Sequence, residues 1–220
     1  FYENYGPDAI LAGATPVFVP LESPGWVLDL DRLRKSFTKK TKAIILNTPH
    51  NPTGRVFTRE EVGQIADLCI EHGVWAITDE IYEHIRFAGG HHVMAGLPGM
   101  RERTITISGL SKTFSCTGWR LGYVIAPPSV TGAIRKVHDF LTVGAPAPLQ
   151  AAGAVGLAFD ADYYNHLAID YRARRDVMVA ALADAGFKFT APEGAYYILA
   201  DFSALSGQDD VAFAKWMTRE

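Results

Sequence analysis

Short apolar runs alternate with amphipathic stretches along the first part of the chain. The apolar runs predict strands at residues 17–19, 43–46, 74–78, 104–108 and 121–126. The run at 43–46 is uninterrupted, which is typical of a strand buried on both faces. Amphipathic spacing predicts helices at residues 30–37 and 58–72. Strands that alternate with helices in this way indicate an α/β fold.

Two local signals define the ends of the second helix. Thr58 can accept a backbone hydrogen bond as its N-cap, and Glu61 stands at the capping-box position. Gly73 follows the last helical residue and suits a left-handed cap. We therefore expect this helix to have sharp boundaries.

The pattern changes in the second part of the chain. It predicts helices at residues 130–141, 149–159 and 163–185, and strands at 187–190 and 196–201. In the last strand Tyr196 and Tyr197 would point to opposite faces. We place a domain boundary inside the third helix, so that residues 1–168 form a large domain and residues 169–220 begin a smaller one. The chain starts at Phe1 and ends in a helix-like pattern, so we expect a piece of a longer protein.

Composition narrows the possible classes of protein. With 220 residues, 48% hydrophobic and 20% charged, the chain is neither disordered, nor collagen-like, nor a disulfide-rich miniprotein. The net charge of −3, without a block of like charges, argues against a nucleic-acid or membrane-surface partner. Cys69 and Cys116 lack metal-ligand spacing, so we expect no metal site and a cytoplasmic location. No apolar run approaches the roughly 20 residues of a membrane span.

Polar residues and glycines gather directly after the predicted strands, where open α/β sheets bind ligands. The loop from Asn47 to Gly54 holds Asn51 between two prolines, which suits either a structural turn or a rigid donor to a ligand. Asp79 follows the next strand and could be a helix N-cap. Tyr82, three residues later, lies over the same helical turn, so both side chains could reach one small molecule.

A lysine and an arginine follow the strand at 104–108. Lys112 lies in a Ser-Gly-Leu-Ser-Lys run, where an amine can act as a nucleophile toward carbonyl compounds. A surface lysine is the usual alternative, but few surface lysines have Ser-Gly-Leu-Ser before them and Thr-Phe after them. Arg120 lies between Gly118 and Gly122, where a guanidinium suits a phosphate, and a purely structural arginine is the alternative. The histidines at positions 50, 84, 91 and 92 are most simply loop or surface residues.

Taken together, these stretches resemble the class I and II aminotransferases, pyridoxal-phosphate (PLP) enzymes of fold type I. Gly109 to Gly122 follows G-L-S-K-x-x-S-x-x-G-x-R-L-G, close to the lysine signature of that family, with Cys116 where an apolar residue is usual. The region from Asn47 to Gly122 is most similar to the subgroup of kynurenine aminotransferases and cysteine-conjugate β-lyases. The resemblance implies a three-layer α/β/α domain with a mostly parallel sheet, followed by the start of a smaller α+β domain.

The resemblance also assigns catalytic roles. Lys112 would hold PLP covalently and then move a proton as general base and acid. Asp79 would pair with the protonated pyridine nitrogen, and Tyr82 and Asn51 would hydrogen-bond the phenolic oxygen.

Further residues would complete the cofactor site. Arg120 would bind the phosphate with help from Ser111 or Ser108, although many relatives have a serine where this chain has Gly109. Tyr2 would stack on the cofactor ring, and Tyr5 would be a partner of Asp79. The arginine that holds the substrate carboxylate in this family has no match in the chain.

The resemblance implies amino-group transfer from an amino acid to a 2-oxo acid in a ping-pong cycle. It implies a homodimer with the active site at the interface, into which residues 143–145 could reach. Two alternatives stay open. A PLP-dependent C–S β-lyase would share all these residues, and an aminotransferase-like effector domain of a transcription regulator would need a basic domain elsewhere in the protein.

Overall fold

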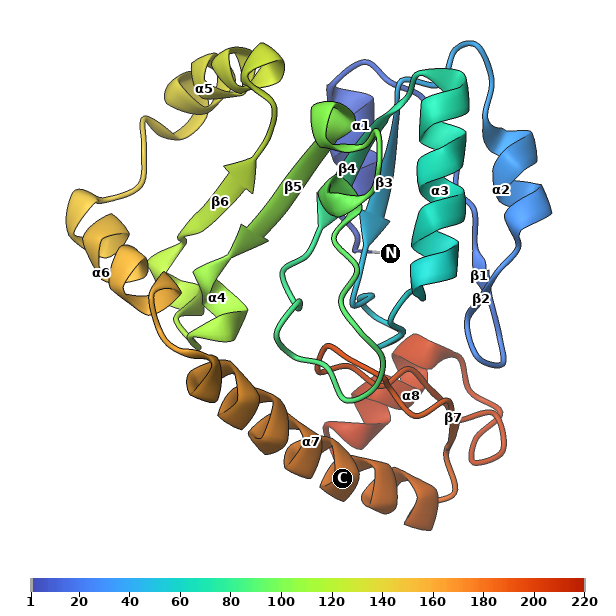
Figure 1. Ribbon diagram of the computed structural model, residues 1–220. Helices are drawn as coiled ribbons and strands as arrows, with labels where there is room; N and C mark the ends of the chain where they lie inside the picture. Colours follow the sequence, from blue (N-terminus) through green and yellow to red (C-terminus); the bar gives the residue numbers. More distant parts are fainter. Residues whose placement is uncertain (1, 220) are drawn as a thin grey trace.

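The computed structural model describes residues 2–219, and its centre is a four-stranded sheet (Figure 1). The strand order is β3-β4-β5-β6, in which the first three strands are parallel and β6 is antiparallel to β5. Two small antiparallel pairs, β1–β2 and β7–β8, lie outside this sheet. The strands are β1 Leu21–Glu22, β2 Val27–Leu28, β3 Ala43–Asn47, β4 Trp75–Asp79, β5 Thr104–Gly109, β6 Gly122–Ile125, β7 Lys188–Phe189 and β8 Ala200–Asp201. The mostly parallel sheet confirms the predicted α/β class.

Helices lie on both sides of the sheet. Figure 1 shows α3 beside β3, on the side away from β4, with α1 behind the strands. The helices are α1 Tyr5–Leu11, α2 Leu30–Ser36, α3 Arg59–His72, α4 Leu110–Thr113, α5 Pro128–Thr142, α6 Ala147–Leu157, α7 Ala161–Asp184 and α8 Asp210–Met217. Short 3₁₀ turns occur at η1 Met94–Gly96, η2 Arg101–Arg103 and η3 Thr117–Trp119. No helix in the described part of the chain is long and apolar enough to cross a membrane.

Helix α3 has the ends that the sequence predicts. The Thr58 hydroxyl accepts from the Glu61 amide, and the Glu61 side chain accepts in return from the Thr58 amide. Gly73 ends the helix at φ 64° and ψ 32°, a left-handed conformation that glycine adopts without steric cost. Capping satisfies backbone groups that would otherwise lack partners, and so it fixes where α3 starts and stops.

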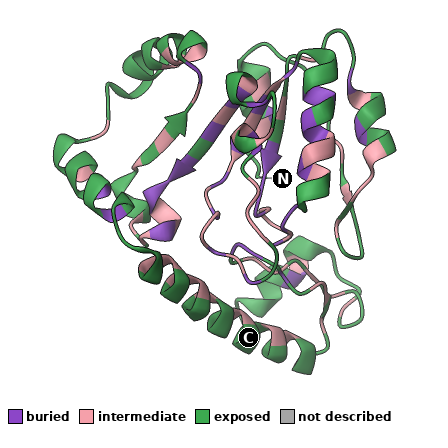
Figure 2. Ribbon diagram, in the orientation of Figure 1, coloured by how far each residue is buried: buried purple, intermediate pink, exposed green. Residues whose placement is uncertain are grey.

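The main core lies between α3 and one face of the sheet. It is built from Leu33, Phe37, Leu46, Phe57, Val62, Ile65, Ala66, Leu68, Cys69, Val74, Ala76, Met94 and Met100. In Figure 2 the buried colour follows the sheet side of α3 and the ends of the strands. Because side chains alternate along a strand, the opposite face of the sheet carries a different set of residues, among them Asp79.

Two of the strands predicted in the first part of the chain differ from the structure. Residues 17–19 form no strand, and the nearby chain pairs instead through β1 and β2. Strand β3 forms as predicted, but it is not buried on both faces, since Ala43 is exposed and Ile45 is 40% exposed. Leu46 points to the other face of β3 and packs in the core with the residues of α3. Among the described residues, only this face of β3 is packed along the whole strand.

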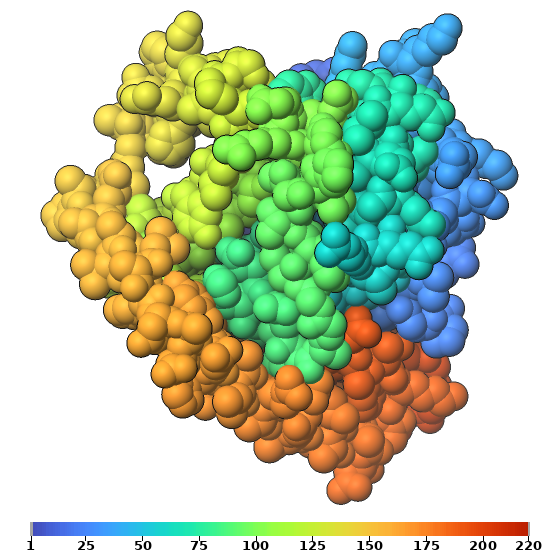
Figure 3. All heavy atoms as spheres, viewed as in Figure 1, coloured from blue at the N-terminus to red at the C-terminus, as the bar shows by residue number. Residues whose placement is uncertain are grey.

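The second part of the chain is more open. Helices α5, α6 and α7 all form close to their predicted bounds, and Figure 3 shows α5 and α6 projecting from the body of the molecule. None of the described residues of α5 is buried, and Phe140 is 92% exposed. Helix α7 is continuous through residue 168, so the domain boundary at that position stays a prediction.

Candidate active site

The predicted site residues meet at the carboxyl ends of the parallel strands. Asn47 at the end of β3 is level with Asp79 at the end of β4, and Asp79 is level with Ile107 of β5. Helix α4 begins directly after β5 and carries Lys112 in its single turn. Three adjacent strands therefore deliver an amide, a carboxylate and an amine to one end of the sheet.

The Asp79 carboxylate is held by two donors. The Tyr5 hydroxyl donates to Oδ2 at 2.6 Å, and the Ile81 amide donates to Oδ1 at 3.2 Å. Burial and the neighbouring Asp79 charge raise the pKa of Tyr5 well above its usual value, so Tyr5 remains a donor at neutral pH. Tyr5 thus pairs with Asp79 as expected, and α1 fixes the carboxylate on its face of the sheet.

The loop after β3 is tied to the same strand end. The Asn47 side chain donates to the Asp79 carbonyl at 2.9 Å, and its Oδ1 accepts from the Asn51 amide at 2.7 Å. The Asn51 side chain is half-buried and makes no hydrogen bond to any other described residue. Its backbone is therefore fixed while its side-chain donors remain available to a ligand.

Tyr82 belongs to a cluster of aromatic side chains beside Lys112. Tyr82 is buried, and its hydroxyl lies 3.0 Å from that of Tyr197. The Tyr196 ring lies edge-on to Tyr82 at 5.2 Å between centroids, and the Lys112 Nζ lies 5.4 Å from the centre of that ring. Tyr171 of α7 stacks on the outer side of Tyr196. These contacts link Lys112 to Tyr82, and Tyr82 follows Asp79 in the same turn.

A close approach of two backbones brings Tyr196 and Tyr197 to this position. Gly54 has φ +71°, and a Cβ there would lie 2.3 Å from Cβ of Pro192. Its carbonyl accepts from the amides of Glu193 and Gly194, each at 2.8 Å. The chain leaving this turn is therefore held against the Asn51 loop.

This contact corrects the predicted strand at residues 196–201, of which only Ala200–Asp201 is a strand. Tyr196 and Tyr197 lie before it and contact Tyr82 from one side rather than alternating across a sheet. The only advance signal was the Pro-Glu-Gly turn just before them.

The lysine loop is compact. A Cβ on Gly109 would lie 3.1 to 3.3 Å from Ile81, Leu121 and Gly122, so a side chain there would require these neighbours to shift by a few tenths of an ångström. Ser111 is half-buried beside Lys112. Arg120 has a left-handed backbone with φ 53°, and its exposed guanidinium donates to the Thr117 carbonyl at 3.2 Å. Most of its donors point to solvent and remain available to an anion.

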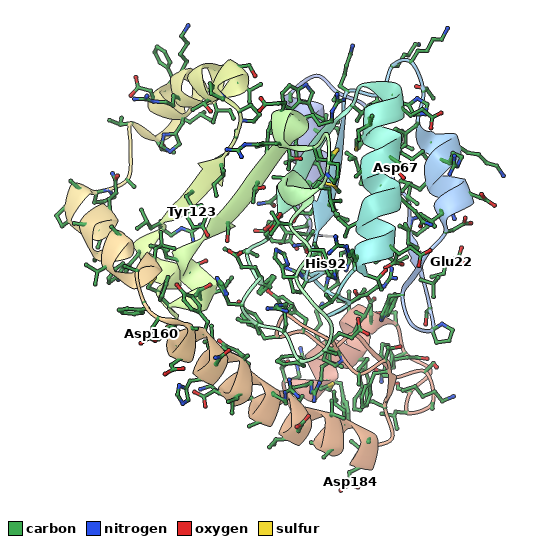
Figure 4. All side chains as sticks on the ribbon, viewed as in Figure 1. Glu22, Asp67, His92, Tyr123, Asp160 and Asp184 are labelled. Atoms are coloured by element: carbon green, nitrogen blue, oxygen red, sulfur yellow. The ribbon has the colours of Figure 1, made fainter. Side chains whose placement is uncertain are left out.

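Ser108 lies on the other face of the sheet. It is buried, and its hydroxyl donates to Oε1 of Glu83 at 2.9 Å. The Tyr123 hydroxyl, labelled on β6 in Figure 4, donates to the same oxygen at 3.1 Å. Because Asp79 is level with Ile107, the next residue along β5 must point away from Asp79. This placement does not favour a phosphate contact for Ser108.

A buried contact between a glutamate and a histidine lies next to this network. The Glu80 carboxylate accepts from the Thr78 hydroxyl at 2.8 Å and contacts the His91 ring. His91 is only 8% exposed, so it is not the surface histidine that the sequence suggests. Ligand atoms of Glu80, Glu83 and His91 lie within 4.8 Å of one another, a spacing that could hold a metal ion. Their carboxylates already have protein donors, which explains their burial without one.

Tyr2 lies near the site but is not buried in it. Its ring meets Tyr5 edge-on at 5.7 Å between centroids and is 40% exposed. Tyr2 therefore lies beside Tyr5, the hydrogen-bond partner of Asp79, and part of its ring is exposed to solvent.

Comparison with known proteins agrees with this geometry. The profile of the family described as "Aminotransferase class I and II" matches residues 1–220. The chain belongs to this family. It is 42% identical to kynurenine–oxoglutarate transaminase 3 of Mus musculus, a match that includes all of this chain and 54% of the mouse protein. It is 36% identical to methionine aminotransferase of Escherichia coli K12, over all of this chain and 57% of that protein. The chain thus spans about half the length of the curated relatives it matches.

A solved structure gives the same result for the fold. N-Succinyldiaminopimelate aminotransferase from Mycobacterium tuberculosis superposes with a TM-score of 0.96 at 38% identity, over 100% of this chain and 58% of that one. The fold is therefore that of the PLP fold type I aminotransferases, as the sequence predicts, and the family cofactor is PLP.

The residues present fit this cofactor. PLP offers a pyridine nitrogen, a phenolic oxygen, an aldehyde and a phosphate. To bind these groups the chain offers a carboxylate held by two hydrogen-bond donors, a phenol, an amide with free donors, an amine and an exposed guanidinium. Each of the four functional groups of PLP therefore has a suitable partner, and the phenolic oxygen has two.

Proposed function

We propose that the protein containing this chain is a PLP-dependent aminotransferase that moves an amino group from an amino acid to a 2-oxo acid in a ping-pong cycle. The observation that carries the proposal is the placement of Asp79 and Lys112 at the same end of two adjacent strands. Tyr82 follows Asp79 by three residues and is linked to Lys112 through the Tyr196 ring. When bound, PLP supplies an aldehyde and an electron-withdrawing ring that stabilises negative charge on the substrate α-carbon.

Lys112 is the proposed catalytic residue. Its amine would bind the aldehyde carbon, and once substrate replaces it the free amine can take a proton from the α-carbon and return it elsewhere. The short α4 helix anchors this side chain directly after β5, and the Tyr196 ring limits its movement on one side. A proton carrier held in this way contributes about 10² to 10⁴-fold to a rate.

Asp79 would hold a proton on the pyridine nitrogen. A carboxylate does this only when it is correctly turned, and the Tyr5 hydroxyl and the Ile81 amide each hold one of its oxygens in place. A protonated ring withdraws electrons more strongly, so this ion pair supports the loss of the α-proton.

The remaining contacts would orient the cofactor. Tyr82 and Asn51 would donate to the phenolic oxygen, and Arg120, with the neighbouring Ser111, would bind the phosphate. Tyr2 would cover one face of the ring. We leave Ser108 out of this set because its hydroxyl donates to Glu83 on the other face of the sheet.

Relatives guide the choice of substrates to test. Their names include kynurenine–oxoglutarate transaminase and methionine aminotransferase. We therefore propose an aromatic or sulfur-containing amino acid as donor and a 2-oxo acid such as 2-oxoglutarate as acceptor.

We further propose a homodimer in the cytoplasm. Exposed apolar side chains on α5 and just after it, Phe140, Leu141 and Val143, favour a covering partner. The free cysteines Cys69 and Cys116 favour a reducing compartment.

A half-reaction assay tests the aminotransferase proposal. The full-length protein, loaded with PLP, is mixed with kynurenine or methionine alone, and the cofactor absorption is followed. We expect the donor to convert the spectrum and added 2-oxoglutarate to restore it. Lys112→Ala should lose about 10²-fold or more of the rate, whereas the matched control Lys42→Ala, at an exposed position, should not.

Two results would count against the proposal. The first is an unchanged spectrum with every amino donor tried. The second is release of pyruvate from a cysteine conjugate without any need for a 2-oxo acid, which is the behaviour of a β-lyase.

A further inference from the structure

The hydroxyl of Tyr82 has a second tyrosine as its hydrogen-bond partner. Tyr197 lies 3.0 Å away, from a segment more than a hundred positions later in the chain. The two rings also meet edge-on at 5.9 Å between centroids. Tyr82 is only 2% exposed, so water cannot easily replace Tyr197 as a partner.

The direction of this hydrogen bond decides what Tyr82 can do. A phenol has one proton to donate and lone pairs that accept. In the structure Tyr82 donates to Tyr197, which directs the Tyr82 proton away from a ligand. Hydroxyl protons rotate to suit their acceptors, and an ionised oxygen is a stronger acceptor than a phenol. A ligand with such an oxygen would therefore draw the Tyr82 proton to itself and leave the Tyr82 oxygen to accept from Tyr197, and donors in such a chain strengthen one another.

We propose that Tyr197 is a positioning residue: when Tyr82 donates to the phenolic oxygen of the cofactor, the Tyr197 hydroxyl donates to Tyr82 in turn and strengthens that hydrogen bond. This inference rests on the proposed function and deepens it. Tyr197 itself need not touch the cofactor, because it acts through the Tyr82 hydroxyl.

The surroundings of Tyr197 support this role. Its main chain follows Ala195, which is fully buried and whose amide donates to the Ile85 carbonyl at 2.9 Å. Its hydroxyl therefore meets Tyr82 from a fixed backbone. Burial raises the pKa of Tyr197, while the hydrogen bond from Tyr82 and the nearby Lys112 charge act in the opposite direction. The net shift is upward, so Tyr197 keeps the proton that it would donate.

A purely structural role predicts something different. If Tyr197 only fills space, its ring matters and its hydroxyl does not. Tyr197→Phe keeps the ring and removes the hydroxyl, so it separates the two explanations. Tyr171→Phe is the matched control, since it removes a hydroxyl from the same aromatic cluster. Tyr171 contacts Tyr196 and Arg174 through its ring, and Phe would keep these contacts.

The experiment is a spectroscopic pH titration of the full-length holoenzyme without substrate. The readout is the pH midpoint of the visible absorption band of bound PLP. A hydrogen bond to the phenolic oxygen favours its ionised form, so a weaker donor moves the midpoint up. We expect Tyr82→Phe to raise it most, Tyr197→Phe to raise it by about 0.5 pH unit, and Tyr171→Phe to leave it in place.

The double variant completes the test. If Tyr197 acts through Tyr82, removing both hydroxyls should give the same midpoint as Tyr82→Phe alone. The proposal is overturned if Tyr197→Phe leaves the midpoint unchanged, or if it shifts the midpoint equally with and without the Tyr82 hydroxyl. Failure of the proposed function looks different, because the wild-type protein would then show no titrating PLP band.

Discussion

Replacing Gly54 by alanine tests the contact that brings the second part of the chain to the site. Gly54 has φ +71°, where an L-residue costs roughly 1–2 kcal/mol. Its new Cβ would also lie 2.3 Å from Cβ of Pro192 and 3.1 Å from the Gly194 carbonyl oxygen. These neighbours are a ring and a backbone, so they cannot swing aside, and overpacking of this kind costs about 1–3 kcal/mol. We expect Gly54→Ala to lower the free energy of unfolding by about 3 kcal/mol.

Two other glycines separate the backbone cost from the steric cost. Gly73 has φ +64° with nothing within 4 Å of its ideal Cβ, so Gly73→Ala should lose only about 1–2 kcal/mol. Gly63 lies inside α3, also in open space, so Gly63→Ala should gain about 0.5–1 kcal/mol. Urea unfolding of the full-length apoprotein, followed by circular dichroism, measures all three. If Gly54→Ala costs no more than Gly73→Ala, the close contact with Pro192 is wrong.

Four further changes test other parts of the account. Thr58→Ala should cost about 1 kcal/mol of stability by urea unfolding, and Thr58→Ser should recover most of it, because the cap needs only a hydroxyl. Tyr5→Phe removes a charged hydrogen bond to Asp79 and should slow the half-reaction about tenfold, whereas an unchanged rate would show that the bond does not matter. Asp79→Ala should keep some PLP binding by absorbance titration but lose most of the half-reaction rate, and a near wild-type rate would contradict its role. Burial lowers the pKa of His50 to about 4. As the pH falls, the unfolded chain therefore binds a proton at His50 at a higher pH than the folded chain does. Stability should be complete above pH 6.5 and fall by about 1.4 kcal/mol per pH unit between 6.5 and 4, a slope that His50→Gln should reduce.

Much of the fold follows from local signals in the sequence. The ends of α3 depend on Thr58, Glu61 and Gly73, whose effects act within one helical turn. The sequence alone predicts that Asp79 and Lys112 lie close together, because the carboxyl ends of parallel strands share an edge of the sheet. Features set by neighbours in sequence were therefore predictable.

Features set by distant neighbours were not. Tyr196 and Tyr197 open an apolar run that predicts a strand, with the two rings on opposite faces, yet the Gly54 contact turns them toward Tyr82. His91 looks like a loop histidine until the fold places it against Glu80. Ser108 is an intermediate case, since strand register alone would have put it on the face opposite Asp79.

The central claim is that Lys112 carries the cofactor, and peptide mapping after borohydride reduction tests it most directly. Reduction fixes PLP on the lysine that holds it, and proteolysis with mass spectrometry then locates that lysine in the full-length protein. The account predicts one labelled peptide, containing Lys112, and no label on the Lys112→Ala variant. A label on any other lysine of the wild-type protein, or none, would contradict it.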